Sequence, residues 1–318
     1  MVKEQAHYEY DLGNSLNLRA FSIDPRLSED GLAQLLSSMS NRDVISLEVH
    51  AKDMHLVAKL DSLSELELKV LPERYRVPEQ LFPYRQALDE KLLREGKKNN
   101  DVLIVKGDIK VPLHIIRGGY FDFMATKLSE VPSKLLPDLY PANKTIGELL
   151  QEYGLRSSDM ARYLGFGFIV MPSNGEEISF VQRAKELGIV AGVMGFPGMT
   201  PHFHEDFLKE NFNFQKYFEQ EIARELQEEY RLLSNEFRTG RCYLIYNKGI
   251  NHPFVAIEVT TPLSTKEIVR RTFGDKDAIK EHPILYSVDF PAISTLLRRF
   301  DLGGSAYVMN LVAKERGG

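Results

Sequence analysis

Four of the five glutamates in residues 214–232 are spaced in a way that suits the binding of a cation. Glu221, Glu225, Glu228 and Glu229 stand at i, i+4, i+7 and i+8, so on an α-helix they share one arc of its surface. Like charges at such spacings repel by roughly 0.2–0.5 kcal/mol per pair, and no lysine stands between them. Grouped carboxylate oxygens favour a divalent cation. The alternative is an ordinary solvated acidic face, which is the commoner role of such a cluster.

The apolar residues of the same segment indicate how this arc is oriented. Ile222, Leu226 and Leu233 fall immediately beside the arc when the segment is drawn as a helix. We therefore expect the carboxylates at the edge of the buried side of the helix, and not on its outermost face.

The sequence around the glutamates resembles the signature of a known family. ARELQEEYRL at 223–232 resembles the REUxEExGU half of the Nudix box, G(x5)E(x7)REUxEExGU, and GFPGM at 195–199 resembles the FPGG turn that opens that box. ISFVQRAKEL at 178–187 resembles the LLxxR strand that precedes it. Residues 165–232 thus resemble a Nudix core, which implies a metal-dependent hydrolase of phosphoanhydrides.

The resemblance implies a role for each matching residue. Glu225, Glu228 and Glu229 match the glutamates that bind Mg²⁺ or Mn²⁺, one of which can double as general base. Arg224 matches the arginine that orients these carboxylates. Gly198 would begin the loop whose backbone faces the metal.

Further residues are candidates for binding the substrate. Phe196 and Gly198 belong to the FPGG-like turn, and Arg183 stands where an arginine could reach a substrate phosphate. A salt bridge from Arg183 to a box glutamate is an equal alternative. Glu281 stands where some Nudix enzymes carry an extra carboxylate on a late loop, and its alternative role is that of a solvated loop acid.

The chain departs from the box at three positions. Met199 replaces the first glycine, Lys216 replaces the first glutamate, and Arg231 replaces the last glycine, while residues 202–214 form an insertion. Glu219 or Glu221 could partly replace the missing glutamate. These departures keep open a different function, a Nudix-fold binding or regulatory module without turnover.

Two resemblances bear on the substrate. GGYFDFMATKLS at 118–129 resembles the Y-x-D-F-x-x-T-N stretch of the UDP-glucose pyrophosphatase branch, which favours a nucleotide sugar. Arg183, Leu187, Gly192 and the turn at 196–198 also fit the pattern of coenzyme A pyrophosphatases, which we keep as the alternative enzyme.

Composition limits the possible partners. The chain has 318 residues, a net charge of −5 and a pI of about 6.0, so no general basic surface for nucleic acid is expected. The longest apolar run, at 187–196, is too short to span a membrane, and the N-terminal residues lack the apolar core of a signal peptide. One cysteine, Cys242, allows no internal disulfide. We expect a cytoplasmic protein that binds a small nucleotide, and its resemblance to a family that often dimerises allows a homodimer.

The order of predicted elements indicates the fold class. Strand pairs at 102–117, 166–183 and 241–260 alternate with helices at 145–154, 214–232 and 262–274. This order predicts an α/β protein with a mixed sheet and helices on both of its faces, as in a Nudix α/β/α sandwich. An α+β N-terminal domain precedes it. The loop at 98–101 is the predicted boundary, giving domains 1–100 and 101–318.

Overall fold

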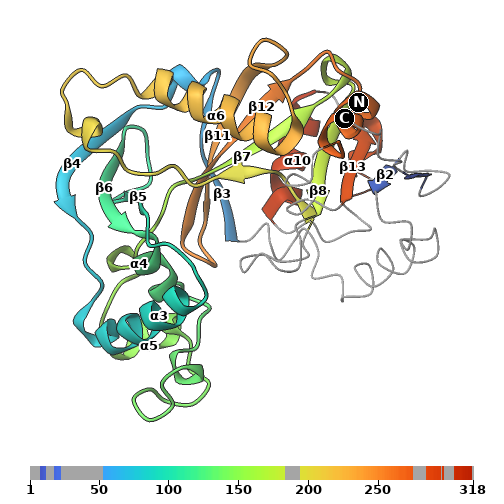
Figure 1. Cartoon of the computed structure of the whole chain (residues 1–318). Coiled ribbons are helices and arrows are strands. Elements are labelled where there is room, and N and C mark those ends of the chain that lie inside the picture. The colour runs from blue at the N-terminus through green and yellow to red at the C-terminus, as the bar shows by residue number, and fades with distance from the viewer. Residues whose placement is uncertain are drawn as a thin grey trace.

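A large mixed β-sheet forms the middle layer of the molecule (Figure 1). The computed structural model describes residues 8–11, 18–22, 53–182, 194–274, 284–294, 296 and 304–316. Across the sheet, the strands of these residues are β1 (Tyr8–Asp11), β2 (Leu18–Ser22), β13 (Ile284–Asp289), β8 (Glu177–Gln182), β7 (Gly165–Met171), β12 (His252–Thr260), β11 (Arg238–Asn247) and β3 (Met54–Leu60). Two short strands, β9 (Met194–Gly195) and β10 (Gly198–Met199), pair with β8 and β7. Strand β12 runs parallel to β7, and the other neighbours pair antiparallel.

The central strand β7 is buried on both of its faces. Phe166 and Phe168 point into one apolar cluster, whereas Ile169 and Met171 point into another. Because neighbouring side chains of a strand point to opposite sides, a nearly continuous apolar run is what a strand covered on both faces requires. The sheet therefore needs a helical layer on each side.

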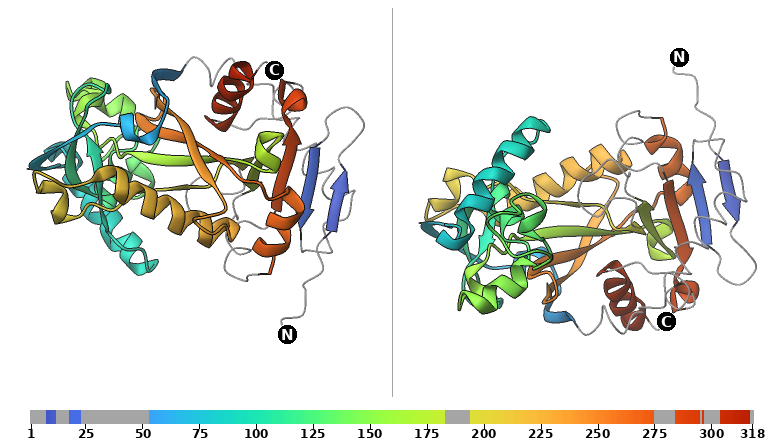
Figure 2. Two further views of the ribbon diagram at one scale, coloured as in Figure 1. Left: turned by 90° about the horizontal axis from the view of Figure 1, so that it is seen from above. Right: turned by 90° about the horizontal axis from the view of Figure 1, so that it is seen from below.

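Helices cover both faces of the sheet (Figure 2). Helices α6 (Phe214–Tyr230) and α7 (Thr265–Thr272) place Ile222 and Ile268 in the same cluster as Phe168. Helix α10 (Gly304–Glu315) places Met309 in the cluster of Ile169, on the opposite face. The predicted α/β/α sandwich with a mixed sheet is confirmed.

A second, smaller sheet lies at one end of the molecule (Figure 1). Its strand order is β4 (Leu68–Arg74), β6 (Leu113–Gly119) and β5 (Asp101–Val105). Below it in Figure 1, helices α3 (Phe82–Arg94), α4 (Tyr120–Ala125) and α5 (Ile146–Glu152) share one apolar core. Helix α5 begins with the capping box that its sequence predicts, since the Thr145 hydroxyl accepts from the N–H of Glu148 and the Glu148 carboxylate accepts from the N–H of Thr145.

Strands from before residue 100 enter both sheets. Strand β3 pairs with β11 in the large sheet, and β4 pairs with β6 in the small one. Both pairings cross the predicted boundary, and the division into domains 1–100 and 101–318 stays a prediction. In the residues that the structure describes, no helix is long and apolar enough to cross a membrane.

Candidate active site

The 17-residue helix α6 positions the acidic residues. It begins where the side chain of Asn213 accepts a hydrogen bond from the N–H of Lys216, at 2.9 Å, as an N-cap residue does. Phe218, Ile222 and Leu226 form its buried stripe. This stripe anchors the helix to the sheet and fixes the direction in which its other faces point. The helix ends at Tyr230, so Leu233 lies beyond it, with its side chain exposed.

The four glutamates lie along one flank of α6, at the edge of its buried side. Glu229 is buried, and the side chains of Glu225 and Glu221 are only 17% and 26% exposed. Glu228 is the outermost, at 57%. The orientation expected from the spacing is therefore found, and a freely solvated acidic face is not.

Arg224 binds three of these four carboxylates. Its Nη1 donates to Oε2 of Glu228 at 2.8 Å, and its Nη2 donates to Oε2 of Glu221 at 2.9 Å and to Oε1 of Glu225 at 2.5 Å. These bonds, that to Glu221 first, raise the pKa of the guanidinium above its ordinary value. Arg224 thus binds the side chains that the resemblance predicts it to orient, and its role in a reaction stays a prediction.

Glu225 and Glu229 form the inner part of the acidic flank. They stand one turn apart, and burial, followed by the negative charge of Glu229, raises the pKa of Glu225 to about 7. A carboxyl group that is hard to ionise in this way gains from a nearby cation. The local charge therefore favours a positive ligand on this side of the helix.

We examined whether a divalent cation fits these residues. Within the described part of the chain, no three Asp, Glu, His or Cys side chains are already grouped as a metal site. Mg²⁺ is usually held by one or two carboxylates together with water and phosphate oxygens. Glu225 and Glu229 supply two hard donors, and Glu228 supplies a third that Arg224 now holds. The donor chemistry fits Mg²⁺ or Mn²⁺, with the three ligands that the resemblance implies.

The FPGG-like turn lies beside the helix, but its residues divide between the two faces of the sheet. Helix α6 packs on β10, and Met199 shares the apolar cluster of Phe218. Phe196 packs instead in the cluster on the α10 face. Gly198 approaches β7 so closely that a Cβ would lie 2.2 Å from the carbonyl oxygen of Phe166. Of the turn residues predicted to bind substrate, Gly198 is therefore beside the acidic helix, and Phe196 faces the other layer.

Two further candidates, Arg183 and Glu281, lie outside the described residues. Leu187 and Gly192, which contribute to the coenzyme A pyrophosphatase pattern, also lie outside them. Their roles stay predictions.

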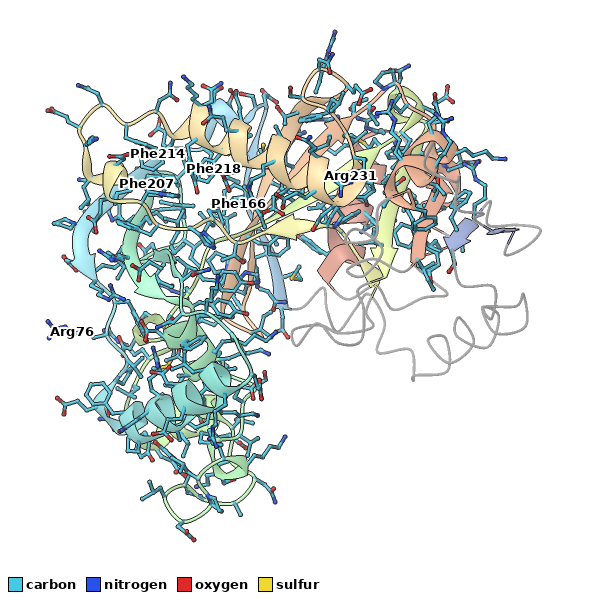
Figure 3. All side chains as sticks on the ribbon, in the orientation of Figure 1. Arg76, Phe166, Phe207, Phe214, Phe218 and Arg231 are labelled. Carbon is cyan, nitrogen blue, oxygen red and sulfur yellow. The ribbon has the colours of Figure 1, made fainter. Side chains whose placement is uncertain are left out.

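The departures from the box have local explanations. Lys216 is exposed on the first turn of α6, two turns before Arg224, so its ammonium does not occupy the acidic flank. Arg231 has φ 56° and ψ 31° and caps the helix in the left-handed conformation, which is the conformation that a glycine at a helix C-terminus usually supplies. Figure 3 shows Arg231 at the end of α6 opposite to Phe214. The helix end is thus built with the expected backbone and an unexpected residue.

The insertion before α6 folds around aromatic rings (Figure 3). The buried Phe207 contacts the rings of Phe212, Phe214 and Tyr217 at centroid distances of 4.8, 5.2 and 4.9 Å. Since Phe214 and Tyr217 belong to α6, the insertion is fixed to the first turn of the helix. It therefore packs against the start of the helix and is not an open loop.

Two carboxylates elsewhere, one buried and one half-buried, were not predicted. Glu258 of β12 accepts from the Tyr243 hydroxyl at 2.7 Å. Glu177 of β8 accepts from Thr265 and Ser287, each at 2.5 Å, and its pKa is lowered by these bonds and by Arg19 against the opposing effect of burial. A charged residue inside an apolar strand, as in FVAIEVT, is the signal that could have identified Glu258. Both carboxylates tie elements of the fold together.

Comparisons with known proteins give structural similarities. No protein-family model matches the chain, and no curated protein does. Among solved structures, the chain is similar to the Nudix domain of NrtR from Shewanella oneidensis in complex with ADP-ribose, with 14% identity over 59% of this chain and 99% of that one and a TM-score of 0.31. It is also similar to a MutT protein from Methanosarcina mazei Go1, with 12% identity over 49% and 95% of the two chains and a TM-score of 0.30. The similarity to RenU, a Nudix hydrolase from M. smegmatis, has 12% identity over 48% and 84% and a TM-score of 0.30.

Proposed function

We propose that this chain is a divalent-metal-dependent Nudix hydrolase that cleaves the pyrophosphate of a nucleoside diphosphate linked to another group. The observation that carries the proposal is the half-buried acidic flank of α6, held by Arg224 beside the turn at Gly198–Met199. Negative charge that is partly withdrawn from water needs a positive partner. A cation with a bound pyrophosphate group supplies a partner of matching charge and chemistry.

Each residue of the flank has a place in this proposal. Glu225, Glu228 and Glu229 would hold Mg²⁺ or Mn²⁺, and the cation would neutralise phosphate charge and activate a water molecule. Arg224 positions the carboxylates through its bonds to Glu225 and Glu228. One of the three glutamates would double as the general base.

The favoured substrate is a nucleotide sugar, in keeping with the resemblance of residues 118–129 to the UDP-sugar-cleaving branch. Coenzyme A is the alternative substrate, because of Arg183, Leu187, Gly192 and Phe196. We assign Arg183, Gly198 and Glu281 to the binding of substrate as part of the same proposal, whereas Phe196, the fourth residue predicted to bind it, packs on the α10 face of the sheet. The compartment is proposed to be the cytoplasm, and the free, buried thiol of Cys242 is compatible with that. We also propose that the protein forms a homodimer and does not bind nucleic acid.

The test is hydrolysis by purified protein. The protein is incubated with Mg²⁺ or Mn²⁺ and, in turn, UDP-glucose, ADP-ribose, coenzyme A and nucleoside triphosphates. The proposal expects release of a mononucleotide from at least one diphosphate-linked compound, and a loss of at least about a hundredfold in Glu228→Gln. Glu90→Gln is the matched control, because Glu90 is exposed on helix α3, away from the acidic flank. It should keep wild-type activity.

A binding or regulatory module without turnover is the second candidate. Two observations favour it: Arg224 already binds three of the carboxylates, and Lys216 stands in place of the outer glutamate. This candidate expects nucleotide binding, measured by calorimetry, with no product at any metal concentration. Product formation that depends on Glu228 excludes it.

A further inference from the structure

The insertion between the FPGG-like turn and α6 is held at both of its ends. One end is attached to the small sheet, and the other packs on the first turn of α6. We propose that residues 202–213 are a strap that couples the small sheet to α6, so that disturbing the small sheet also loosens the start of the acidic helix. This inference does not depend on the proposed function, because it concerns how α6 is held and not what its carboxylates bind.

The first residues of the strap extend the small sheet. The N–H of Phe203 donates to the carbonyl oxygen of Asp101 at 2.9 Å, and His202 forms an antiparallel β-bridge with Val102. The His202 ring also lies within hydrogen-bond distance of the side-chain amide of Asn100, at 3.2 Å. Strand β5 pairs with β6 along one edge, so the strap begins as a short piece of strand on the other edge of β5.

The side chain of Arg117, on β6, adds to this attachment. Its guanidinium forms an ion pair with Glu205 of the strap, and its Nε donates to Oδ2 of Asp101 on β5 at 2.7 Å. The guanidinium carbon lies 5.8 Å from the centroid of the Phe203 ring, which is within the range of a cation–π contact. One side chain therefore joins both strands to the strap. Because Glu205 is 69% exposed, its ion pair alone contributes little.

Tyr217 receives the other end of the strap on α6. Its hydroxyl donates to the carbonyl oxygen of His202 at 3.3 Å, and its ring lies 4.9 Å from that of Phe207 and 5.5 Å from that of His204. Burial, followed by the negative charge of Glu221, raises the pKa of Tyr217. Glu221 stands one helical turn further along α6. The strap thus ends beside the first glutamate of the acidic flank.

One apolar cluster runs through all three parts. It contains Ile115 of β6, Phe207 of the strap and Phe218 of α6, and all three side chains are buried. Figure 3 shows Phe207 close to Phe214 and Phe218 at the start of α6. Elements that share one core lose their contacts together when one of them opens, so they behave as a cooperative unit. The shared cluster gives the strap a means of passing a disturbance from the small sheet to α6.

The test measures amide hydrogen exchange in the full chain. Ile116→Ala removes a buried side chain of β6 from a cluster that contains no residue of the strap. We expect the amides of residues 217–221 in α6 to exchange at least about tenfold faster than in the wild type. Ile116→Val is the milder form of the same change if Ile116→Ala does not fold. The matched control is Ile293→Ala, the same deletion in the cluster on the α10 face, which should leave the exchange of residues 217–221 unchanged.

A released strap separates this route from any other. Phe203→Ala/Phe207→Ala removes two rings that stand 5.5 Å apart in the strap, and Phe203→Ala/Arg117→Gln is a milder release at the small sheet. In either background, adding Ile116→Ala should change the exchange of residues 217–221 by less than about twofold. A tenfold rise that persists there overturns the strap. So does wild-type exchange of residues 217–221 in Ile116→Ala while the amides of β5 exchange faster, or an equal rise in Ile293→Ala.

Discussion

Gly198 lies against the carbonyl oxygen of Phe166, at the pair that joins β10 to β7, and a Cβ at Gly198 would come within 2.2 Å of that oxygen. Backbone atoms cannot move aside as the end of a long side chain can. We therefore expect Gly198→Ala to separate β10 from β7 and to lower the free energy of unfolding by about 2–4 kcal/mol. Urea denaturation followed by circular dichroism measures this loss.

Gly167 provides the matched control, since it pairs with Gly198. The nearest atom to a Cβ at Gly167 is the carbonyl oxygen of Pro197, at 3.9 Å, which is an ordinary contact. Gly167→Ala should change the free energy of unfolding by less than about 1 kcal/mol. Equal losses in the two variants would show that the close approach at Gly198 is not the reason for its glycine.

The inner pair of glutamates predicts a dependence of stability on pH. The folded-state pKa of Glu225, about 7, is above its ordinary value of 4.5, so the folded protein keeps a proton that the unfolded chain loses. The resulting stability is complete below pH 4.5 and is lost as pH rises through 7. In EDTA, the free energy of unfolding of Glu225→Gln, relative to that of the wild type, should therefore rise by about 1–2 kcal/mol between pH 5 and pH 8. Urea midpoints at the two pH values test this.

Glu219→Gln serves as the control for this pH dependence. Glu219 is exposed on α6 and binds Gln215 at 2.9 Å, away from the acidic flank. Its variant should follow the wild type at both pH values. A Glu225→Gln variant that keeps the same difference from the wild type at pH 5 and pH 8 contradicts the raised pKa.

The parts of the fold that the sequence predicted are those that local patterns decide. The apolar run around Phe168, the capping box at Thr145 and the helical stripe of Ile222 each act within a few residues. The pairing of β3 with β11 joins residues nearly two hundred positions apart. No local pattern specifies such a partner, so the prediction did not contain it.

For the candidate site too, the sequence predicted what local spacing decides and did not predict what depends on side-chain conformation or on distant contacts. Helical spacing was enough to place Glu225 and Glu229 on one flank, and it brought Arg224 within reach of Glu228. Spacing did not show that one guanidinium binds three carboxylates, because that depends on rotamers. It also did not show that Phe196 faces the α10 layer, because Phe196 lies between two strands of two residues each, which are too short to have a periodic pattern.

The aromatic insertion predicts that two neighbouring residues, Phe207 and Leu208, contribute very differently to stability. Phe207 is buried among five other aromatic rings of the insertion and α6, whereas Leu208 is 44% exposed. Removing a buried phenyl ring costs about 3–5 kcal/mol, so Phe207→Ala should loosen the insertion and the first turn of α6. Leu208→Ala should cost less than about 1 kcal/mol. Hydrogen exchange of the amides of residues 203–218 should rise only in Phe207→Ala, and equal exchange in both variants contradicts the packing role of Phe207.

His252 predicts a loss of stability in acid that has nothing to do with the acidic flank. Its ring stacks on Tyr163 at a centroid distance of 4.3 Å, and its Nε2 has no hydrogen-bond partner among the described residues. Burial lowers the pKa of His252 from 6.5 to about 4. The unfolded chain therefore takes up a proton that the folded protein refuses, and stability is lost as pH falls from 6.5 towards 4. His252→Asn has no such proton to take up. The amount by which its free energy of unfolding falls below that of the wild type should therefore shrink by about 1 kcal/mol between pH 7 and pH 5.

The control is His114→Asn, at an exposed position of β6, whose difference in free energy of unfolding from the wild type should not shrink. Urea midpoints at the two pH values decide it, because a deficit that stays constant in His252→Asn means that the folded protein accepts the proton.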